Sequence, residues 1–254
     1  MNIQTLLNDE YTFRNQHDEL SFDKPDPLLI AKKHNDEYIA LICALFSYGN
    51  ASLIVKFINS LDYDLLNCED KRIEQVLQAK YYRFQKSSDV IALFIALKRL
   101  KQIDSLENIF YNAYKKENCI LEGMDKLIKT IHKSNPHHSQ GYTFLVGSSL
   151  KRDKQHKIKY IGNAPYKRWN MYLRWMVRRD NLDMGLWSKI DKSDLILPLD
   201  THTFKVSQKM GLLNRKIYDL KSAILITEKL REYDPLDPIK YDFALYRLGQ
   251  EKIF

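Results

Sequence analysis

The chain has 254 residues, of which 44% are hydrophobic and 28% are charged. This composition is ordinary for a folded protein, and the length allows one large domain or two small ones that share a cleft. No apolar run approaches the roughly 20 residues of a membrane-spanning helix, so we expect no membrane partner. The three cysteines are widely spaced and the N-terminus is polar and acidic. We therefore expect a cytoplasmic protein without disulfides, bound metal or iron–sulfur cluster.

The formal net charge is +8, and the basic residues are concentrated in one segment. Eleven lysines and arginines lie between Lys133 and Arg179, where Asp153 is the single acid. One basic block on a nearly neutral chain favours a polyanionic partner. A solvated face explains the same run without any partner, so charge alone leaves both interpretations open.

Apolar residues recur with helical spacing in the N-terminal half. A stripe over residues 38–45 predicts a helix with Asn35 as its cap, and a stripe over residues 90–97 predicts another, capped by Ser87 or Ser88. Few segments alternate as strands do. This half of the chain therefore indicates packed helices.

The least regular stretch runs from residue 135 to residue 165 and contains the segments NPHHSQG, VGSSLKRDKQHK and IGNAP. It is typical of a linker or a long functional loop, with room for a short hairpin. We expect residues 1–134 to form an N-terminal helical subdomain and residues 166–254 a C-terminal one, with 135–165 as a basic loop or linker. The two subdomains are expected to be interleaved into one unit.

The segment YKRWNMYLRWMVRRD follows this loop and predicts a helix with two distinct faces. One face carries Trp169, Tyr172, Leu173 and Met176, which we expect to be buried. Another face carries Lys167, Met171, Arg174 and Arg178. These cations either decorate a solvent face or have a function, in which the arginines bind phosphates and Lys167, at the helix start, supplies a nucleophilic amine.

In LPLDTHTFKV, Asp200 directly precedes an apolar-periodic run. The position predicts an N-cap, whose carboxylate accepts amide N–H groups of a helix that extends to about Met210. The same carboxylate can face a reacting centre, and the two roles are compatible. His202 lacks the spacing of a metal ligand, so we interpret it as a packed or DNA-facing side chain.

The C-terminal region predicts two further helices. Residues 223–230 carry one stripe, and the last helix has Asp237 as its cap, Pro238 in its first turn and Gly249 at its end. The chain as a whole therefore predicts an all-α fold of roughly ten short helices.

An acid, Asp242, interrupts the apolar stripe of the last helix. A buried carboxylate has to be paired or hydrogen-bonded, and in a functional interpretation it accepts a purine N–H. An acid at the edge of the stripe is instead exposed, or bridged to Lys240 or Arg247. Both interpretations stay open at this point.

The segment LPLDTHTFKV resembles the Val-Asp-Thr-His segment of the helix-hairpin-helix DNA glycosylase superfamily, and the resemblance extends from Asn35 to the C-terminus. In that superfamily the aspartate at a helix N-terminus lies beside a catalytic lysine, which corresponds to Asp200 and Lys167. The classical hairpin, Leu-Pro-Gly-Val-Gly, is missing here. Lys167 and Asp200 are 33 residues apart, more than in the classical members.

A closer resemblance is to the archaeal-type 8-oxoguanine DNA glycosylase subclass, which has a longer arm between lysine and aspartate and a degenerate hairpin. The segment YDFALYRLG is similar to its final helix, in which an aspartate and an aromatic residue contact the damaged base. The matching positions are Asp242 and Tyr246, where tyrosine replaces the family's tryptophan. We expect both, with Met171, to bind the base. The segments KRWNMYLRWMVR, MGLW, PLDTHTF and DPIKYDFALYRLG also resemble a bacterial family known mainly as a domain of unknown function.

The N-terminal segment DEYIALICALFSYGNASLIVKFI is similar to the superfamily's helix–loop–helix, whose loop enters the DNA at the lesion. Ser47 and Asn50 fall in this loop, but Gly49 replaces the wedge glutamine. A helix C-cap at Gly49 explains the local sequence equally well.

The resemblance implies two helical subdomains of the helix-hairpin-helix glycosylase type with a cleft between them. It implies a base-excision-repair DNA glycosylase with AP (β-)lyase activity, in which Lys167 and Asp200 excise 8-oxoguanine from duplex DNA through a lysine Schiff base. The expected DNA contacts come from the loop at residues 151–159 and from Ser47, Asn50, Lys154, Arg168, Arg174, Arg178 and His202.

The implied partner is double-stranded DNA with a damaged purine. We expect no cofactor, a monomer, and association with the nucleoid if the source is bacterial. Two alternatives stay open: a helical protein that binds nucleic acid without catalysis, and a glycosylase or lyase for another lesion.

Overall fold

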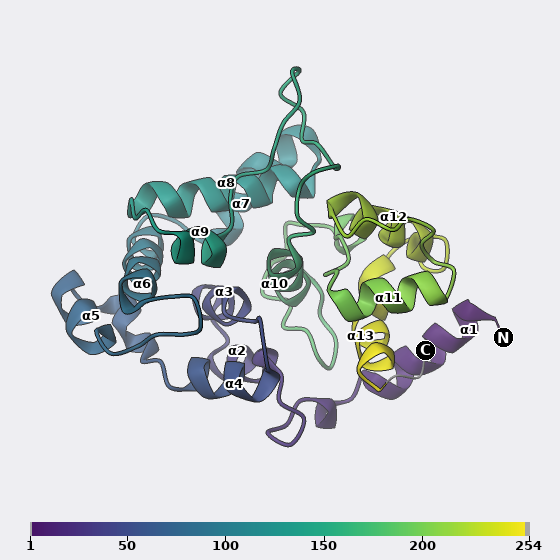
Figure 1. The fold of residues 1–254 in the computed structure, drawn as a ribbon, viewed down its shortest axis with the longest axis horizontal. Coiled ribbons are helices and arrows are strands. Elements are labelled where there is room, and N and C mark those ends of the chain that lie inside the picture. Colours follow the sequence, from purple (N-terminus) through teal and green to yellow (C-terminus); the bar gives the residue numbers. More distant parts are fainter. Residues whose placement is uncertain (1, 252–254) are drawn as a thin grey trace. The chain divides into compact units, whose positions relative to one another are not determined.

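A computed structural model describes residues 2–251 and contains thirteen α-helices and no strand in that range. The predicted all-α fold is thereby confirmed. The chain forms two compact units, shown in Figure 1: unit 1 comprises Met1–Lys24 and Lys151–Phe254, and unit 2 comprises Pro25–Leu150. No helix among the described residues is both long enough and apolar enough to cross a membrane.

Unit 2 holds eight α-helices and one 3-10 turn. They are α2 (Pro27–His34), α3 (Glu37–Leu45), α4 (Ala51–Asn59), η2 (Tyr63–Asn67), α5 (Asp70–Leu77), α6 (Ser87–Lys101), α7 (Leu106–Glu117), α8 (Ile120–Ser134) and α9 (Gln140–Val146). In Figure 1, α7 and α8 run side by side. A Cβ at Gly123 on α8 would lie only 2.6 Å from the Phe110 ring on α7, so a glycine is needed for this close approach.

Two helix starts in unit 2 differ from the prediction. Asn35 does not cap α3 but ends α2 in the left-handed conformation, with φ of 49°, which asparagine tolerates better than most residues. Asp36 caps α3 instead. In α6, Ser87 is already helical, and the backbone N–H of Lys86 donates to the Asp89 carboxylate at 2.9 Å.

The expected linker region contains ordered structure and divides differently from the prediction. Residues 135–150 belong to unit 2, where Ser139 caps α9 and also donates to the Asp89 carboxylate at 2.5 Å. The unit boundaries fall after Lys24 and after Leu150, so neither coincides with residue 134 or residue 166. Residues 252–254, at the end of the expected C-terminal subdomain, lie outside the described residues.

The described residues of unit 1 form five α-helices and three 3-10 turns. They are α1 (Ile3–Arg14), η1 (His17–Glu19), α10 (Lys167–Val177), η3 (Lys192–Asp194), α11 (Thr201–Lys209), α12 (Leu220–Arg231), η4 (Pro238–Tyr241) and α13 (Asp242–Gln250). From Trp169 to Val177 every residue of α10 is buried, so the predicted division into an apolar and a cationic face is wrong. α10 is a core helix of this unit.

The last helix is built differently from the prediction at both ends. Asp237 makes no side-chain cap; a short 3-10 turn, η4, precedes α13. Gly249 lies inside α13, and a Cβ there would come within 3.1 Å of His202 and Val206 on α11. Gly249 therefore allows α11 and α13 to approach closely rather than ending the helix.

Before α10 the chain forms a tight hairpin over residues 151–159. An antiparallel bridge joins Arg152 and Ile158, so the short hairpin considered for this stretch is present. The buried Asn163 side chain holds its base, accepting from the Lys151 N–H at 2.9 Å and donating to the Lys159 carbonyl at 2.6 Å.

Candidate functional site

Lys167 is the first residue of α10 and lies at its partly exposed end. Tyr166 precedes it in the left-handed conformation, with φ of 49°. One turn further, the Asn170 side chain donates to the Pro165 carbonyl at 3.0 Å. The amine is thus carried by a fixed helix start, as the sequence predicted.

Asp200 is the N-cap of α11, and its carboxylate accepts the Thr203 N–H at 2.8 Å. The predicted cap and the predicted end of the helix near Met210 are confirmed. Asp200 remains partly exposed. Tyr218 donates to the Leu199 carbonyl at 2.8 Å, and its pKa is raised, first by burial and then by the negative charge of Asp200.

Asp242, at the start of α13, is 5% exposed and forms an ion pair with Arg174 on α10. Burial raises the pKa of Asp242 to about 6, although the positive charge of Arg174 lowers this pKa. The charges of Asp200 and Lys167 also act on this carboxyl, with opposite signs. The open choice between a buried and an edge position is settled in favour of the buried one.

The helix α13 packs against α11, where Gly249 lies against His202 and Val206, and the Arg174–Asp242 pair ties α13 to α10. The charges of Lys167 and Asp200 act on Asp242 in agreement with this packing. These three side chains come from three different elements: the start of α10, the cap of α11 and the start of α13. An amine, a half-exposed carboxylate and a buried carboxylate are thereby brought together from distant parts of the sequence.

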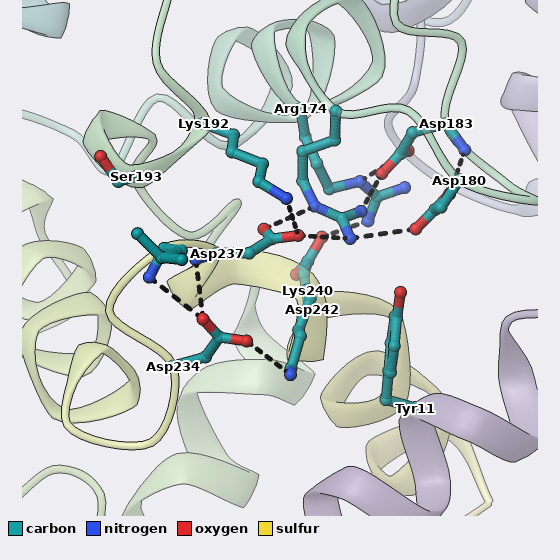
Figure 2. A network of polar contacts seen from close by, with 12 residues as sticks. Tyr11, Arg174, Asp180, Asp183, Lys192, Ser193, Asp234, Asp237, Lys240 and Asp242 are labelled. Carbon is teal, nitrogen blue, oxygen red and sulfur yellow. Dashed lines mark hydrogen bonds and ion pairs between the residues drawn. The ribbon is translucent and has the colours of Figure 1, made fainter.

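Asp242 belongs through Arg174 to a buried ionic network, which Figure 2 shows. Arg174 Nε donates to Asp183 at 3.1 Å, and Arg178 also pairs with Asp183. Arg178 further donates from Nε to Asp237 at 2.8 Å and pairs with Asp180 at 2.9 Å. Burial opposes the charge of Arg178, but Asp183 and its other acidic neighbours outweigh burial and raise the pKa of Arg178.

The expectation that Arg174 and Arg178 bind DNA phosphates is therefore corrected. Their exposed fractions are 6% and 4%, and their donors are already engaged by carboxylates. The cavity beside them has a volume of about 10 Å³, room for a single water. These arginines form internal ion pairs that link segments of unit 1.

The other two residues expected to bind the base lie one helical turn from members of the group. Met171 is buried on α10, four residues after Lys167. Tyr246 is half-buried on α13, four residues after Asp242, and its hydroxyl accepts from the Gln250 side chain at 2.7 Å. Positions four residues apart share a helix face, so Met171 lies on the face of Lys167 and Tyr246 on that of Asp242.

Three expected DNA contacts in unit 1 keep some access to solvent. Lys154 is exposed in the 151–159 hairpin, Arg168 is half-buried at the start of α10, and His202 is exposed in the first turn of α11. Their positions are compatible with a surface role.

In unit 2 the two expected DNA contacts in the loop after α3, Ser47 and Asn50, differ in exposure. Ser47 is 4% exposed and donates to the Cys43 carbonyl at 2.7 Å, so its expected role as a DNA contact is corrected. Asn50 is exposed and caps α4, accepting the Leu53 N–H at 3.2 Å. Gly49 has φ of 104°, and a Cβ there would lie 2.5 Å from the Arg83 guanidinium.

The acidic partners of the two arginines were not expected from the sequence. Asp180 and Asp183 follow Arg178 in the segment RRDNLD, and this alternation of charge was an available signal. The sequence predicts a helix cap for Asp237, and no local pattern links it to Arg178, which lies 59 residues away.

No curated protein and no solved structure matches the chain. One family model, described as protein of unknown function (DUF2400), matches residues 26–251. Its range includes Lys167, Asp200 and Asp242 and leaves out α1. The match confirms the resemblance to a family of unknown function, and the chain belongs to the DUF2400 family.

Proposed function

We propose that the protein is a DNA glycosylase with β-lyase activity that excises a damaged purine, with 8-oxoguanine as its principal substrate. The observation that carries the proposal is the meeting of three helices: α13 packs against α11 and is ion-paired to α10. Lys167, Asp200 and Asp242 stand at the N-terminal ends of these helices. The resemblance of their sequence segments to the helix-hairpin-helix glycosylases supplies the reaction class. The helical fold is compatible with it.

In the proposed reaction the Lys167 amine forms a bond to the sugar C1′ as the bond from C1′ to the base breaks. The electron pair leaves on the base, which takes up a proton, and Asp200 accepts the proton that the attacking amine loses. Opening of the C1′–O4′ bond gives a Schiff base. In this opening the electron pair goes to O4′, which takes the proton that Asp200 accepted. Water then removes a C2′ proton, the freed electron pair forms a C2′–C3′ double bond, and the C3′–O bond breaks, so that the 3′ phosphate leaves with its electron pair.

Asp200 performs this role while it caps α11. Its carboxylate uses one oxygen, Oδ1, to accept the Thr203 N–H. The negative charge also stabilises a cationic sugar during bond cleavage. The cap and the catalytic role are thus two consequences of one fixed carboxylate.

Base recognition falls to Asp242, Met171 and Tyr246 in this proposal. Arg174 engages Oδ2 of Asp242, and Oδ1 is the atom we assign to a purine N–H. A flipped base is distinguished by such hydrogen bonds and by packing against apolar or aromatic side chains. Met171 and Tyr246 offer those surfaces.

The DNA-binding surface in this proposal is centred on the 151–159 hairpin. Lys151, Lys154, Lys157 and Lys159 are all exposed there. The Asp153 carboxylate accepts the Gln155 and Lys157 N–H groups, each at 2.9 Å, and so shapes the turn. Exposed lysines on a fixed turn suit sequence-independent phosphate contacts.

Borohydride trapping on duplex DNA with one 8-oxoguanine tests the proposal. The wild-type protein is expected to form a covalent adduct and Lys167→Ala none, whereas Lys205→Ala, which removes an exposed lysine of α11, traps like the wild type. Asp200→Asn retains an oxygen for the cap and should lose turnover by about 10²- to 10⁴-fold with unchanged stability.

Equal trapping by Lys167→Ala would remove the lysine assignment. Parallel duplexes with uracil, an alkylated purine or an abasic site identify another lesion if 8-oxoguanine is not cleaved. Binding to all duplexes with no adduct on any of them would show the non-catalytic alternative instead.

A further inference from the structure

Arg174 connects the two parts of the candidate site that come from different helices. It lies on α10, seven residues after Lys167, and pairs with Asp242 at the start of α13. Residues seven apart lie two helical turns along the same side of a helix. The guanidinium therefore ties the helix of the amine to the carboxylate that we assign to the base.

Arg174 is itself fixed from behind. Its Nε donates to Asp183 at 3.1 Å, Asp183 also pairs with Arg178, and Arg178 donates to Asp237 at 2.8 Å. All of these side chains are buried. A guanidinium with its donors in such a network has one orientation available, and so does the carboxylate that it holds.

We propose that Arg174 is a positioning residue that acts through Asp242, holding this carboxylate ionised and in one orientation so that base recognition fails in acid when Asp242 takes up a proton. The inference rests on the proposed function. It gives Arg174, expected from the sequence to contact phosphate, a different role in the same reaction.

The charged groups that act on Asp242 come from each neighbouring element. Arg174 and Lys167 on α10 favour its ionised form, and Asp200 at the cap of α11 disfavours it. His202 on α11 lies against Gly249, two turns further along α13. Burial raises the pKa of Asp242 to about 6 even with Arg174 in place, so the ionised state at neutral pH depends on this pairing.

The test compares two reactions of one protein over a range of pH. Excision of the proposed base requires both recognition and Lys167, whereas borohydride trapping on a preformed abasic site requires Lys167 without a base. For the wild type we expect the ratio of excision kcat/KM to abasic-site trapping to fall below about pH 6, and for Asp242→Asn we expect no such acid limb.

Arg174→Gln keeps hydrogen-bond donors but removes the charge. We expect the acid limb to move up by about one pH unit, which lowers the ratio about twofold at pH 7 and up to about tenfold below pH 6. Arg174→Lys should restore part of the ratio. Arg215→Gln is the matched control, because it breaks the Arg215–Asp219 pair elsewhere in unit 1 and should leave the ratio unchanged.

A ratio that does not move in Arg174→Gln overturns the inference and leaves the proposed function intact. An equal loss of excision and abasic-site trapping also overturns it, because Arg174 is then only structural. If Arg174→Gln does not fold, the double variant Arg174→Gln/Asp183→Asn, which removes one opposing charge, replaces it with the same expected shift. Absence of trapping by the wild type on every duplex refutes the proposed function, and the inference with it.

Discussion

Arg174 on α10, Arg178 at the end of this helix and the lysines of the 151–159 hairpin belong to one basic block of the sequence, but the fold puts the two arginines and the lysines in opposite environments. Arg174 and Arg178 are buried and paired with carboxylates, whereas Lys154 and Lys157 are exposed. A buried charge must be compensated inside the protein, whereas an exposed one is available to a partner. Residues of the same formal charge therefore form internal ion pairs in one segment and a positive surface in the other.

The largest difference between the two regions is expected in stability. Arg178→Met removes one counter-charge from the buried Asp183, which keeps Arg174, and one from Asp237, which keeps only the exposed Lys192. Breaking buried pairs in this way costs about 3–5 kcal/mol. Lys157→Met in the hairpin should change the free energy of unfolding by less than about 0.5 kcal/mol. Urea unfolding measures both. A similarly small loss of unfolding free energy in Arg178→Met and Lys157→Met would contradict the contrast between buried and exposed charges.

The buried charges should also give stability an unusual pH dependence. The pKa of Asp242 is about 6 in the folded protein, above its ordinary value of 3.8. The folded state therefore keeps a proton that the unfolded state releases, and this group's contribution to stability falls as pH rises between those values. Between pH 3.8 and about 6, the free energy of unfolding of Asp242→Asn should therefore rise relative to that of the wild type by on the order of 3 kcal/mol.

The control for this measurement is Asp219→Asn. Burial raises the pKa of Asp219, but the hydrogen bonds from Arg215 and Ser222 and the positive charge of Arg215 together outweigh burial, and the net pKa is lowered. The contribution of Asp219 to stability is therefore present at neutral pH and lost in acid. The difference in unfolding free energy between Asp219→Asn and the wild type should thus change with pH in the opposite direction. A flat curve for Asp242→Asn would show that its carboxyl ionises in the folded protein as it does in the unfolded chain.

The smallest expected effect concerns DNA affinity. Replacing Lys154, Lys157 and Lys159 by Gln should weaken binding to undamaged duplex roughly tenfold, and should reduce the slope of log affinity against log salt by about 2 to 3. Filter binding or fluorescence anisotropy at several salt concentrations measures both. The matched control replaces three exposed lysines of unit 2, Lys71, Lys116 and Lys126. Equal losses in the two triple variants would show that the hairpin has no special role.

Local sequence patterns were sufficient for several parts of the candidate site. Asp200 caps α11 as predicted, because an N-cap depends only on residues within one turn. The start of α10 at Lys167 and the burial of Trp169, Tyr172, Leu173 and Met176 are likewise confirmed, although the burial extends to the other faces of the helix. The cap and the helix start arise from interactions between neighbours in the chain, and the apolar spacing of these four residues already marked them as buried.

Only the tertiary structure decided which charges are internal. Asp242 lies 68 residues from Arg174 in the sequence and Asp237 lies 59 from Arg178, and no local pattern indicates such pairs. The same holds for Gly249, whose place against α11 depends on two helices meeting. The sequence determined the helices and their caps through short-range hydrogen bonds and apolar periodicity. Burial and ion pairing depend on distant segments, so the fold alone assigned Arg174 and Arg178 to the interior.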